Sequence, residues 1–377
     1  MTPRPEGAPS IAVVGAGIGG LTLAACLLRV GVRVTLYEQA QAFSRVGAGI
    51  QMGPNAMRIL ARLGLRERLE PLAFSPPELA NREWDSGELT FALPMRDAEA
   101  TYGAPYFLLH RGDLHEALAT LVPDDMVRLD HKLARIEEGA GDVRLEFENG
   151  RCEHADLVIA ADGVHSPVRQ ALFSSETATF TGRVAYRTVF PAELLAADRR
   201  PAKAATKWWG PDRHIVVYYV SGGREVYFTT SVPDEGWTIE SWSREGSVDE
   251  LRAAFRGFHP EVTAVLHGCP TVHKWAIYDR EPLPTWHTGR IALLGDACHP
   301  MTPYMAQGAA TAMEDGVVLS RCLELFGPNR ADTALATYEA ARKPRTSKIQ
   351  AESRTNRWLY RSQNPHWVYD YDAWNVA

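Results

Sequence analysis

A glycine-rich turn near the start of the chain constrains its fold more than any other feature. The apolar run Ile11–Val14 leads into this turn, in which Gly15, Gly17 and Gly20 have the spacing GxGxxG. Such a run is typical of a parallel strand buried on both faces, and residues 21–30 that follow the turn have a helical pattern. In this arrangement the first glycine permits a tight turn, the second lets backbone approach a pyrophosphate, and the third lets helix pack on strand.

The next strand supplies a second part of the same pattern. Residues 32–38 form an apolar, β-branched run that ends at Glu38, roughly 20 residues after the glycine turn. An acidic residue at this place can accept hydrogen bonds from an adenosine ribose. The glycine spacing alone is a weak signal, and a turn without a ligand is the alternative. The full strand–helix–strand context favours a dinucleotide, without distinguishing FAD from NAD.

Composition excludes several classes of protein. The 377 residues are 45% hydrophobic and 23% charged, as in globular proteins, which disfavours disorder and fibrous repeats. The net charge of −6 gives no general attraction to nucleic acid or anionic membranes. The five scattered cysteines form no CxxC pair or zinc-site spacing, so we expect no metal site and reduced thiols in a cytoplasmic protein. The apolar stretch 11–28 contains four glycines, which argues against a membrane span or signal peptide.

Patterns of alternation predict an interrupted domain. Parallel α/β signals occur at both ends of the chain, and hairpin-like pairs of strands occupy the middle. A C-terminal segment, 333–360, has a helical pattern that Pro344 is expected to interrupt. The predicted class is α/β, with a Rossmann-like nucleotide-binding domain, an inserted, mainly antiparallel sheet and C-terminal helices. We expect the nucleotide-binding domain at 1–75, 101–177 and 276–345, the inserted substrate domain at 76–100 and 178–275, and the C-terminal helical segment at 346–377.

Two further motifs follow predicted buried strands. The first is Asp162-Gly163, and the second is Gly295-Asp296, which is followed by Ala306-Gln307-Gly308 at the start of a predicted helix. An aspartate at a strand end can fix a loop through its N–H groups or hold a hydroxyl of a ligand. Taken singly, each is more often an Asx-turn or a helix N-cap.

In this order and spacing, the three motifs resemble the FAD-dependent aromatic hydroxylases, the single-component flavoprotein monooxygenases. The resemblance covers nearly the whole chain and implies FAD as cofactor. It assigns Glu38 to the adenosine ribose, Arg111 to the flavin side chain and Asp296 to the ribityl chain. It also places Arg45 and the loop 46–51 along FAD, and gives Asp162 a role in handling FAD and NAD(P)H. The helix end at Gln307 and Gly308 would point at the flavin N1 and C2 carbonyl, where its positive dipole stabilises reduced flavin.

The stretch 207–219 looks like that of the 6-hydroxynicotinate 3-monooxygenases, and the 3-hydroxybenzoate 6-hydroxylases share much of it. In both groups the residues matching His214 and Tyr218 lie beside the substrate hydroxyl. Alternation along a strand places these two side chains on one face, although covering a sheet surface is the usual role of such residues. Gln51 and Tyr304 stand where the hydroxynicotinate enzymes have histidines, and Ala205 replaces a pocket cysteine. Gln51 and Tyr304 fit the hydroxybenzoate pattern better, and we expect both to bind substrate.

The resemblance also implies the reaction. NADH or NADPH, bound transiently, would reduce FAD, and O2 would then form a C4a-hydroperoxyflavin. A small hydroxylated aromatic or hydroxypyridine carboxylic acid would be hydroxylated para to its hydroxyl, with loss of CO2 where the carboxylate occupies that carbon. His214, relayed through Tyr218, is the expected catalytic base. A homodimer is also implied.

Alternatives to the 6-hydroxynicotinate type are a 3-hydroxybenzoate 6-hydroxylase or salicylate hydroxylase activity. An NAD-dependent dehydrogenase is disfavoured by the second and third motifs, and a flavin halogenase by the absence of its Trp-x-Trp-x-Ile-Pro motif. The more remote alternative is a non-catalytic FAD-binding sensor.

Overall fold

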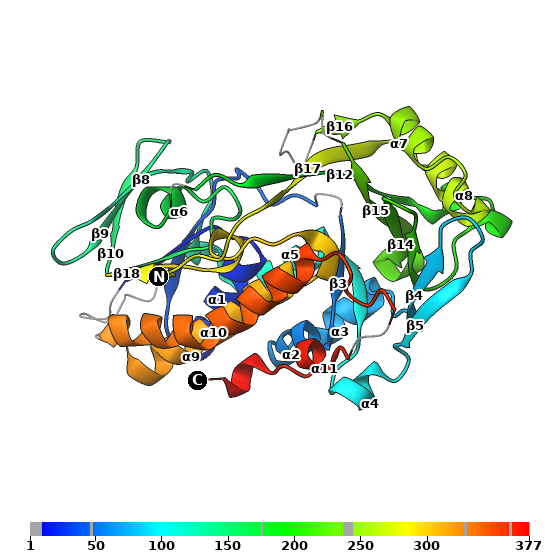
Figure 1. Cartoon of the computed structure of the whole chain (residues 1–377). Helices are drawn as coiled ribbons and strands as arrows, with labels where there is room; N and C mark the ends of the chain where they lie inside the picture. The colour runs from blue at the N-terminus through cyan, green and yellow to red at the C-terminus, as the bar shows by residue number, and fades with distance from the viewer. Residues whose placement is uncertain are drawn as a thin grey trace.

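A parallel sheet forms the first layer of the protein (Figure 1). The computed structural model describes residues 10–45, 48–174, 176–234, 236, 244–327, 330–361 and 364–376. Within them, a six-stranded sheet has the order β18-β19-β11-β1-β2-β7, and every neighbouring pair except β18–β19 is parallel. Its strands are β1 Ile11–Val14, β2 Val34–Tyr37, β7 Val127–Arg128, β11 Leu157–Ala160, β18 His287–Thr288 and β19 Ile291–Leu293. The expected strand–turn–helix unit is confirmed, because α1 Ile18–Arg29 follows β1 and β2 pairs with β1.

Long helices pack together beside this sheet. The central helix α9, Gly308–Phe326, lies against α1 and against α10, Ala331–Arg354 (Figure 1). The contact with α1 is close, because a Cβ at Gly316 would stand 2.9 Å from the backbone nitrogen of Leu23. Only a glycine permits this approach, so the position of α9 on α1 is set by backbone contact.

The expectation that Pro344 interrupts the last long helix is wrong. The helix α10 runs unbroken through Pro344. Proline removes one backbone hydrogen bond and crowds the preceding turn, but buried side chains on both sides of it hold the helix in place. Tyr338 and Arg342 precede the proline and Thr346 follows it, and all three are fully buried.

The second layer is an eight-stranded sheet, counted over the described residues, with the order β16-β17-β12-β15-β14-β13-β4-β5. Helices α7 Val248–Ala254 and α8 Pro260–Gly268 lie beside it. Figure 1 shows these helices at the outer side of the sheet, away from α9 and α10. The strands are β4 Glu78–Glu83, β5 Leu89–Pro94, β12 Thr179–Pro191, β13 Ala205–Trp209, β14 His214–Val220, β15 Glu225–Pro233, β16 Glu245–Gly246 and β17 Val272–Asp279. Strand β17 thus continues to Asp279, beyond residue 275, where the inserted domain is expected to end.

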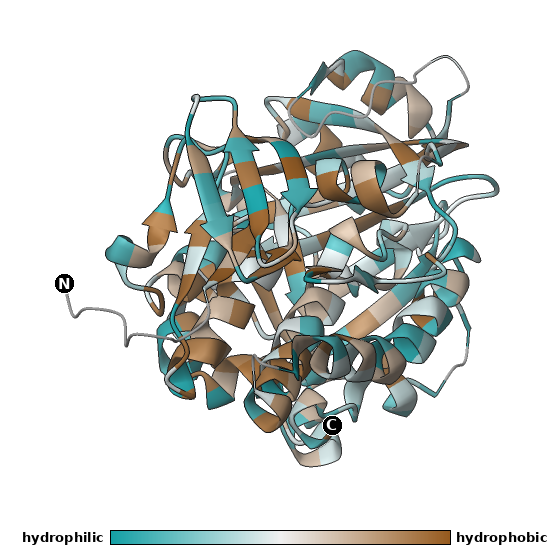
Figure 2. Cartoon of the chain, turned by 90° about the vertical axis from the view of Figure 1, so that its left-hand side faces the viewer, coloured by the Kyte–Doolittle hydropathy of each residue, from teal (hydrophilic) through white to brown (hydrophobic). Residues whose placement is uncertain are grey.

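Alternation gives the two faces of this sheet different roles. Trp208, Ile215 and Val217 belong to an apolar core that includes Leu251 of α7 and Val262 of α8. The residues between them on the strands point to the opposite face, toward the parallel sheet. In Figure 2 the hydrophobic colour follows the interior strands and inner helix faces, while the hydrophilic colour gathers at outer turns.

Smaller elements complete the fold. The ribbon β3–β6 contacts β14 of the eight-stranded sheet, and the three-stranded sheet β10-β9-β8 lies at the end of the molecule away from α7 and α8 (Figure 1). Their strands are β3 Gly49–Met52, β6 Phe107–His110, β8 Leu133–Glu138, β9 Val143–Phe147 and β10 Cys152–Ala155. The remaining α-helices are α2 Pro54–Arg62, α3 Arg66–Leu69, α4 Ala98–Tyr102, α5 Arg111–Ala119, α6 Pro167–Leu172 and α11 His366–Tyr369. The architecture is therefore mixed α/β, as predicted.

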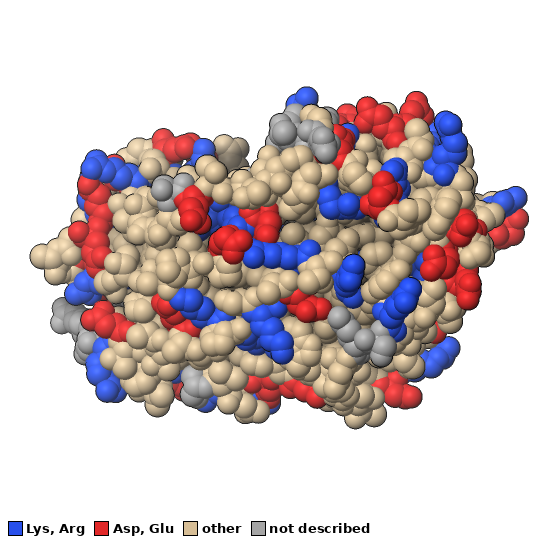
Figure 3. Space-filling view, viewed as in Figure 1, with Lys and Arg blue, Asp and Glu red and all other residues tan. Residues whose placement is uncertain are grey.

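Three further observations concern the described part of the chain. No helix in it is both long and apolar enough to cross a membrane. Figure 3 shows acidic and basic side chains interspersed over the face of Figure 1. All five cysteines are free, and four of them are buried.

Candidate active site

The cavity that the loops of all three motifs reach, called the main cavity below, lies between the two sheets. It has a volume of about 380 Å³ and is lined by Gly17, Gly163, Asp296 and Gly308 on the side of the parallel sheet. Tyr218, Tyr227 and Trp275 line it on the side of the antiparallel sheet. The loops after β1, β11 and β19 all reach this cavity, because the carboxyl ends of parallel strands meet at one edge.

The glycine turn leaves room for a phosphate group. Gly15 has a φ of +103°, and a Cβ there would lie 2.3 Å from the carbonyl oxygen of Ala161. A Cβ at Gly20 would lie 2.1 Å from the carbonyl oxygen of Gly15. By contrast, a Cβ at Gly17 would meet nothing within 4 Å. Gly15 and Gly20 are thus required by the fold, whereas Gly17 borders open space at the N-terminus of α1, as a pyrophosphate site requires.

Glu38 is held beside this turn. Its Oε2 accepts a hydrogen bond from the backbone nitrogen of Ala16 and its Oε1 accepts one from that of Ala40, each at 2.9 Å. The carboxylate is therefore fixed next to the glycine turn. This is the place from which it could accept bonds from a ribose, since each oxygen has a second lone pair.

The second and third motifs are tied together by Arg169, which the sequence analysis did not single out. Arg169 is buried, and its guanidinium donates to the carbonyl oxygens of Val164 at 2.6 Å and Ala297 at 3.2 Å. It thus bridges the loop of Asp162 and the loop of Asp296. Arg169 stands seven residues after Asp162 in the sequence, but nothing in the sequence shows its partner on the other loop.

The two aspartates differ in environment. Oδ2 of Asp162 accepts from the backbone nitrogen of Val168 at 3.4 Å, whereas Oδ1 is buried without a hydrogen-bond partner among the described residues. Burial raises the pKa of Asp162 to about 6. Asp296 lines the main cavity, and its side chain is exposed there. Asp162 is not among the residues that line the main cavity, although its neighbours Ala161 and Gly163 are. The carboxylate of Asp296 faces the cavity and fits a ligand rich in hydroxyl and N–H groups.

The two arginines named from the sequence have different positions. Arg111 begins α5 and lines the main cavity. Arg45 forms ion pairs with Asp113 at 2.7 Å and Glu225 at 2.8 Å, and these hydrogen-bonded carboxylates raise its pKa. Arg45 therefore joins α5 to β15 and does not line the main cavity. Val46 and Gly47 of the neighbouring loop lie outside the described residues.

The N-terminus of α9 faces the main cavity. Gly308, Ala309 and Ala312 line it, and Gln307 is the N-cap residue. Oε1 of Gln307 accepts a hydrogen bond of 3.0 Å from Nδ2 of Asn55. The unpaired N–H groups and positive dipole of this helix end favour negative charge in the cavity.

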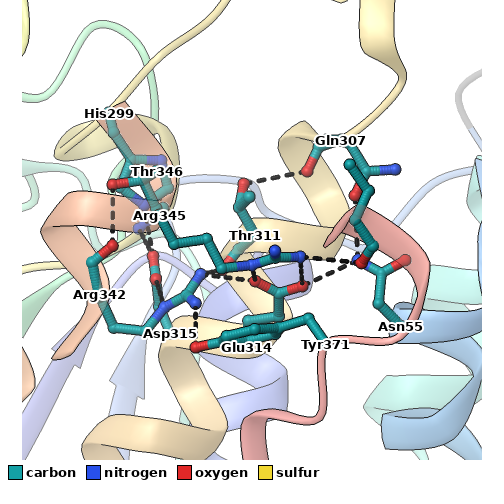
Figure 4. A network of polar contacts seen from close by, with 12 residues as sticks. Asn55, His299, Gln307, Thr311, Glu314, Asp315, Arg342, Arg345, Thr346 and Tyr371 are labelled. Atoms are coloured by element: carbon teal, nitrogen blue, oxygen red, sulfur yellow. Dashed lines mark hydrogen bonds and ion pairs between the residues drawn. The ribbon is translucent and has the colours of Figure 1, made fainter. Parts of the chain in front are cut away.

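A buried charge network lies behind this helix end (Figure 4). Glu314 is paired with Arg342 and Arg345, each at 2.8 Å. Asp315 is paired with Arg342 at 2.7 Å and accepts from Nε2 of His299 at 2.5 Å. Burial alone would raise the pKa of both carboxyl groups, but the cationic partners outweigh it and lower both pKa values. Two carboxylates thus face two guanidiniums, and the network fixes α10 and the Gly295-Asp296 loop to α9.

A second, smaller cavity of about 110 Å³ adjoins the first. Gln51, Thr229, Pro303 and Ala306 line both cavities. A flavin ring in the first would therefore lie beside a ligand in the second. The smaller cavity is further walled by a mainly aromatic and apolar set that includes Leu79, Tyr106, Ala205, Val216, Tyr304, Met305, Trp358, Leu359 and Tyr369.

His214 and Tyr218 both lie on the cavity face of β14, yet they line different cavities. His214 lines the smaller one and Tyr218 the larger one. Burial and the positive charges of Lys207 and Arg183 lower the pKa of His214 well below its usual value, whereas burial raises that of Tyr218 well above it. Four residues of strand separate them by roughly 13 Å. A proton relay between them therefore needs a bridging group.

The other two predicted substrate residues lie at the boundary of the cavities. Oη of Tyr106 donates to Oε1 of Gln51 at 2.6 Å. Oη of Tyr304 lies 2.9 Å from Oγ of Ser231, and the Tyr304 ring lies 5.7 Å from that of His214. The structure thus brings Gln51, His214 and Tyr304 to one cavity. No group of metal-ligating residues occurs in the described part of the chain.

The comparisons with known proteins agree with this geometry. Residues 9–353 match the family described as FAD binding domain. The chain is 44% identical to the 6-hydroxynicotinate 3-monooxygenase of Pseudomonas fluorescens, over 98% of this chain and 96% of the relative. It is 35% identical to the 3-hydroxybenzoate 6-hydroxylase of Polaromonas naphthalenivorans, over 99% and 93%. The crystal structure of Klebsiella pneumoniae HpxO complexed with FAD and uric acid has a TM-score of 0.83 at 28% identity, and covers 96% of this chain and 91% of that one.

Fold, cavity and sequence thus define a class of enzyme, the FAD-dependent aromatic hydroxylases. The chain belongs to the FAD binding domain family, and FAD is its cofactor.

Proposed function

We propose that the enzyme hydroxylates a small hydroxylated aromatic or hydroxypyridine carboxylic acid, para to its hydroxyl group, using NADH or NADPH and O2. The observation that carries this proposal is the position of His214 in the smaller, mainly aromatic cavity that adjoins the main cavity, where FAD would bind. The names of both relatives place the hydroxyl group and the hydroxylated carbon at ring positions 3 and 6. These two positions are para to each other.

Different residues of the site would bind the cofactor and exclude water from the substrate. Bound FAD would supply the redox chemistry that activates O2 for the ring, with NAD(P)H as the reductant. Gly17, Glu38 and Asp296 would hold the cofactor, and the N-terminus of α9 would face its negative charge. The aromatic walls of the smaller cavity would keep water from the reacting ring.

The proton chemistry follows from the environment of two side chains. His214 has a lowered pKa and is therefore neutral at pH 7, so it can accept the proton of the substrate hydroxyl and make the ring electron-rich. Tyr218 has a raised pKa and stays protonated. It therefore acts as a hydrogen-bond donor at the boundary with the FAD cavity.

Two substrate types remain as candidates. A 6-hydroxynicotinate-type substrate is favoured by the higher identity, and its carboxylate sits on the carbon to be hydroxylated, so CO2 would be released. Gln51, Tyr304 and Ala205, which depart from the hydroxynicotinate pattern, favour a 3-hydroxybenzoate-type substrate, and a salicylate-type one is a further alternative.

We also propose that the eight-stranded sheet with α7 and α8 is the substrate domain. Its inward face carries His214, and the FAD-side loops close the cavity from the parallel sheet. The free cysteines favour a cytoplasmic location. A homodimer stays a prediction that gel filtration tests.

NAD(P)H consumption with hydroxybenzoates and hydroxypyridine carboxylates, combined with product analysis, tests the activity. We expect consumption to rise with one aromatic acid and a para-hydroxylated product to accumulate. His214→Gln should slow product formation while FAD stays bound. A colourless protein that binds no FAD, or consumption that no aromatic changes, would contradict the proposal and favour the sensor or an oxidase.

A further inference from the structure

The smaller cavity has an unbalanced charge. Among its described lining residues there is one lysine, Lys207, and no aspartate or glutamate. Lys207 lies on β13 opposite Val216 of β14, so its side chain shares the inward face with His214. The sequence analysis quoted the segment that contains it but gave it no role.

The partners of Lys207 are neutral. Its Nζ donates to Oδ1 of Asn356 at 3.2 Å and stands 3.8 Å from the centre of the Trp209 ring and 6.0 Å from that of Tyr304. Within the described part of the chain, no carboxylate forms an ion pair with it. Lys207 is half-buried, and its surroundings and the positive charge of Arg183 lower its pKa to about 7. A negative charge on a ligand beside it would favour the charged ammonium form.

Asn356 places this charge next to His214. Its Oδ1 accepts from Lys207, while its Nδ2 lies 3.4 Å from Nδ1 of His214. The ammonium group and the imidazole therefore belong to the same end of the cavity. An oxygen that gives its proton to His214 would become an anion close to Lys207.

We propose that Lys207 is the anion-binding residue of the substrate cavity and receives an anionic oxygen of the aromatic ligand. This oxygen belongs either to the ring hydroxyl after it loses its proton or to the carboxylate. The inference rests on the proposed function for the class of ligand. The match between a positive Lys207 and a negative ligand depends only on the residues that line the smaller cavity.

Binding to the FAD-loaded enzyme tests the proposal, with dissociation constants measured by calorimetry for three probes: 3-hydroxybenzoate, benzoate and 3-hydroxybenzamide. Lys207→Met keeps the length of the side chain and removes its charge. We expect it to weaken binding at least tenfold for a subset of the probes, and Lys207→Arg to restore part of that loss. The control is Lys203→Met, which removes an exposed lysine two residues before β13.

The pattern of losses identifies the oxygen. A loss confined to 3-hydroxybenzoate and benzoate assigns Lys207 to the carboxylate, whereas a loss confined to the two hydroxyl-bearing probes assigns it to the ring oxygen. Equal losses for all three probes, or no loss, would overturn the proposal.

A second measurement does not depend on the choice of probe. At pH 6, below the lowered pKa of Lys207, the charged side chain should cost the folded protein stability. The Tm of the ligand-free Lys207→Met protein should therefore exceed that of wild type at this pH, and an unchanged or lower Tm would overturn the proposal. If no probe binds to wild type but the Tm rises, the benzoate version of the proposed function fails while the charge assignment stands.

Discussion

Asn55 and Gln307 lie 252 residues apart in the chain and are joined by a buried hydrogen bond of 3.0 Å from Nδ2 to Oε1. The same Nδ2 donates to Oε1 of Glu314 at 2.8 Å. Asn55 therefore fastens the first turn of α2 to the N-cap of α9 and to the charge network behind it. The helix end that faces the FAD cavity is positioned by these polar contacts.

Replacing this amide tests the arrangement. Asn55→Ala removes the buried donor to Oε1 of Gln307 and one of the donors to Glu314, which keeps its two arginines. The unpaired amide oxygen should cost about 1–3 kcal/mol of unfolding free energy. Because the helix end loses its fixed position, we expect FAD to bind about tenfold more weakly. Urea unfolding and FAD fluorescence titration measure the two effects. Asn149→Ala, in an exposed turn, serves as control, and an unchanged FAD affinity in Asn55→Ala would refute the positioning role.

A substitution at Gly17 should change FAD binding without changing the stability of the fold. A Cβ at this position meets no protein atom within 4 Å, so Gly17→Ala should leave the Tm of the FAD-free protein within a degree or two of wild type. The added methyl group would occupy the space of the pyrophosphate, so FAD affinity should fall at least tenfold. Gly141→Ala, which also meets nothing within 4 Å, should change neither quantity. Equal FAD affinity in all three proteins would show that the phosphates lie elsewhere.

The charge network should be sensitive to loss of one partner. Arg342→Leu leaves Glu314 and Asp315 with too little positive charge in a fully buried place, and we expect it to destabilise the protein by about 3–5 kcal/mol. The exposed Arg330→Leu should cost less than about 0.5 kcal/mol. Denaturant unfolding of the FAD-loaded proteins measures the difference. Similar values for the two variants would mean that the pairs contribute little.

The pH profile of hydroxylation should report His214. A base works in its neutral form, and the pKa of His214 is well below 6.5, so its protonation should lower kcat at saturating substrate only below about pH 6. The groups that face it are Lys207 on β13, Arg183 on β12, Tyr304, and Asn356 after α10. Lys207→Met removes one positive charge and should move the acidic limb to higher pH, whereas Lys203→Met should not. If the rate falls at the same acidic pH in both variants, the assignment of this pH dependence to His214 is contradicted.

Much of the cofactor site could be predicted from the sequence because its signals are local. Gly15 needs a positive φ within its own turn, and Asp162 and Asp296 follow their strands directly. His214 and Tyr218 share a face because alternation along one strand requires it. Pro344 shows the limit of such reasoning, since buried contacts of neighbouring residues kept the helix intact through it.

The smaller cavity could not be predicted in the same way. The proposed role of Lys207 depends on its contact with Asn356, 149 residues further on. It also depends on the absence of aspartate and glutamate among the described residues that line the cavity. Arg169 and Asn55 likewise have partners more than 100 residues away. No residue type or spacing in the sequence marks these contacts.

The sequence by itself determined the class of fold, the cofactor and the family. The glycine turn and the two aspartate motifs are each specified within a few residues, and their order along the chain is what resembles the flavoprotein hydroxylases. Only the tertiary structure decided which charges meet in the substrate cavity and what holds the helix over the flavin site. Both depend on burial, since a lysine or a carboxylate has an ordinary pKa in water and a shifted one where solvent is excluded and distant strands and helices supply the neighbours.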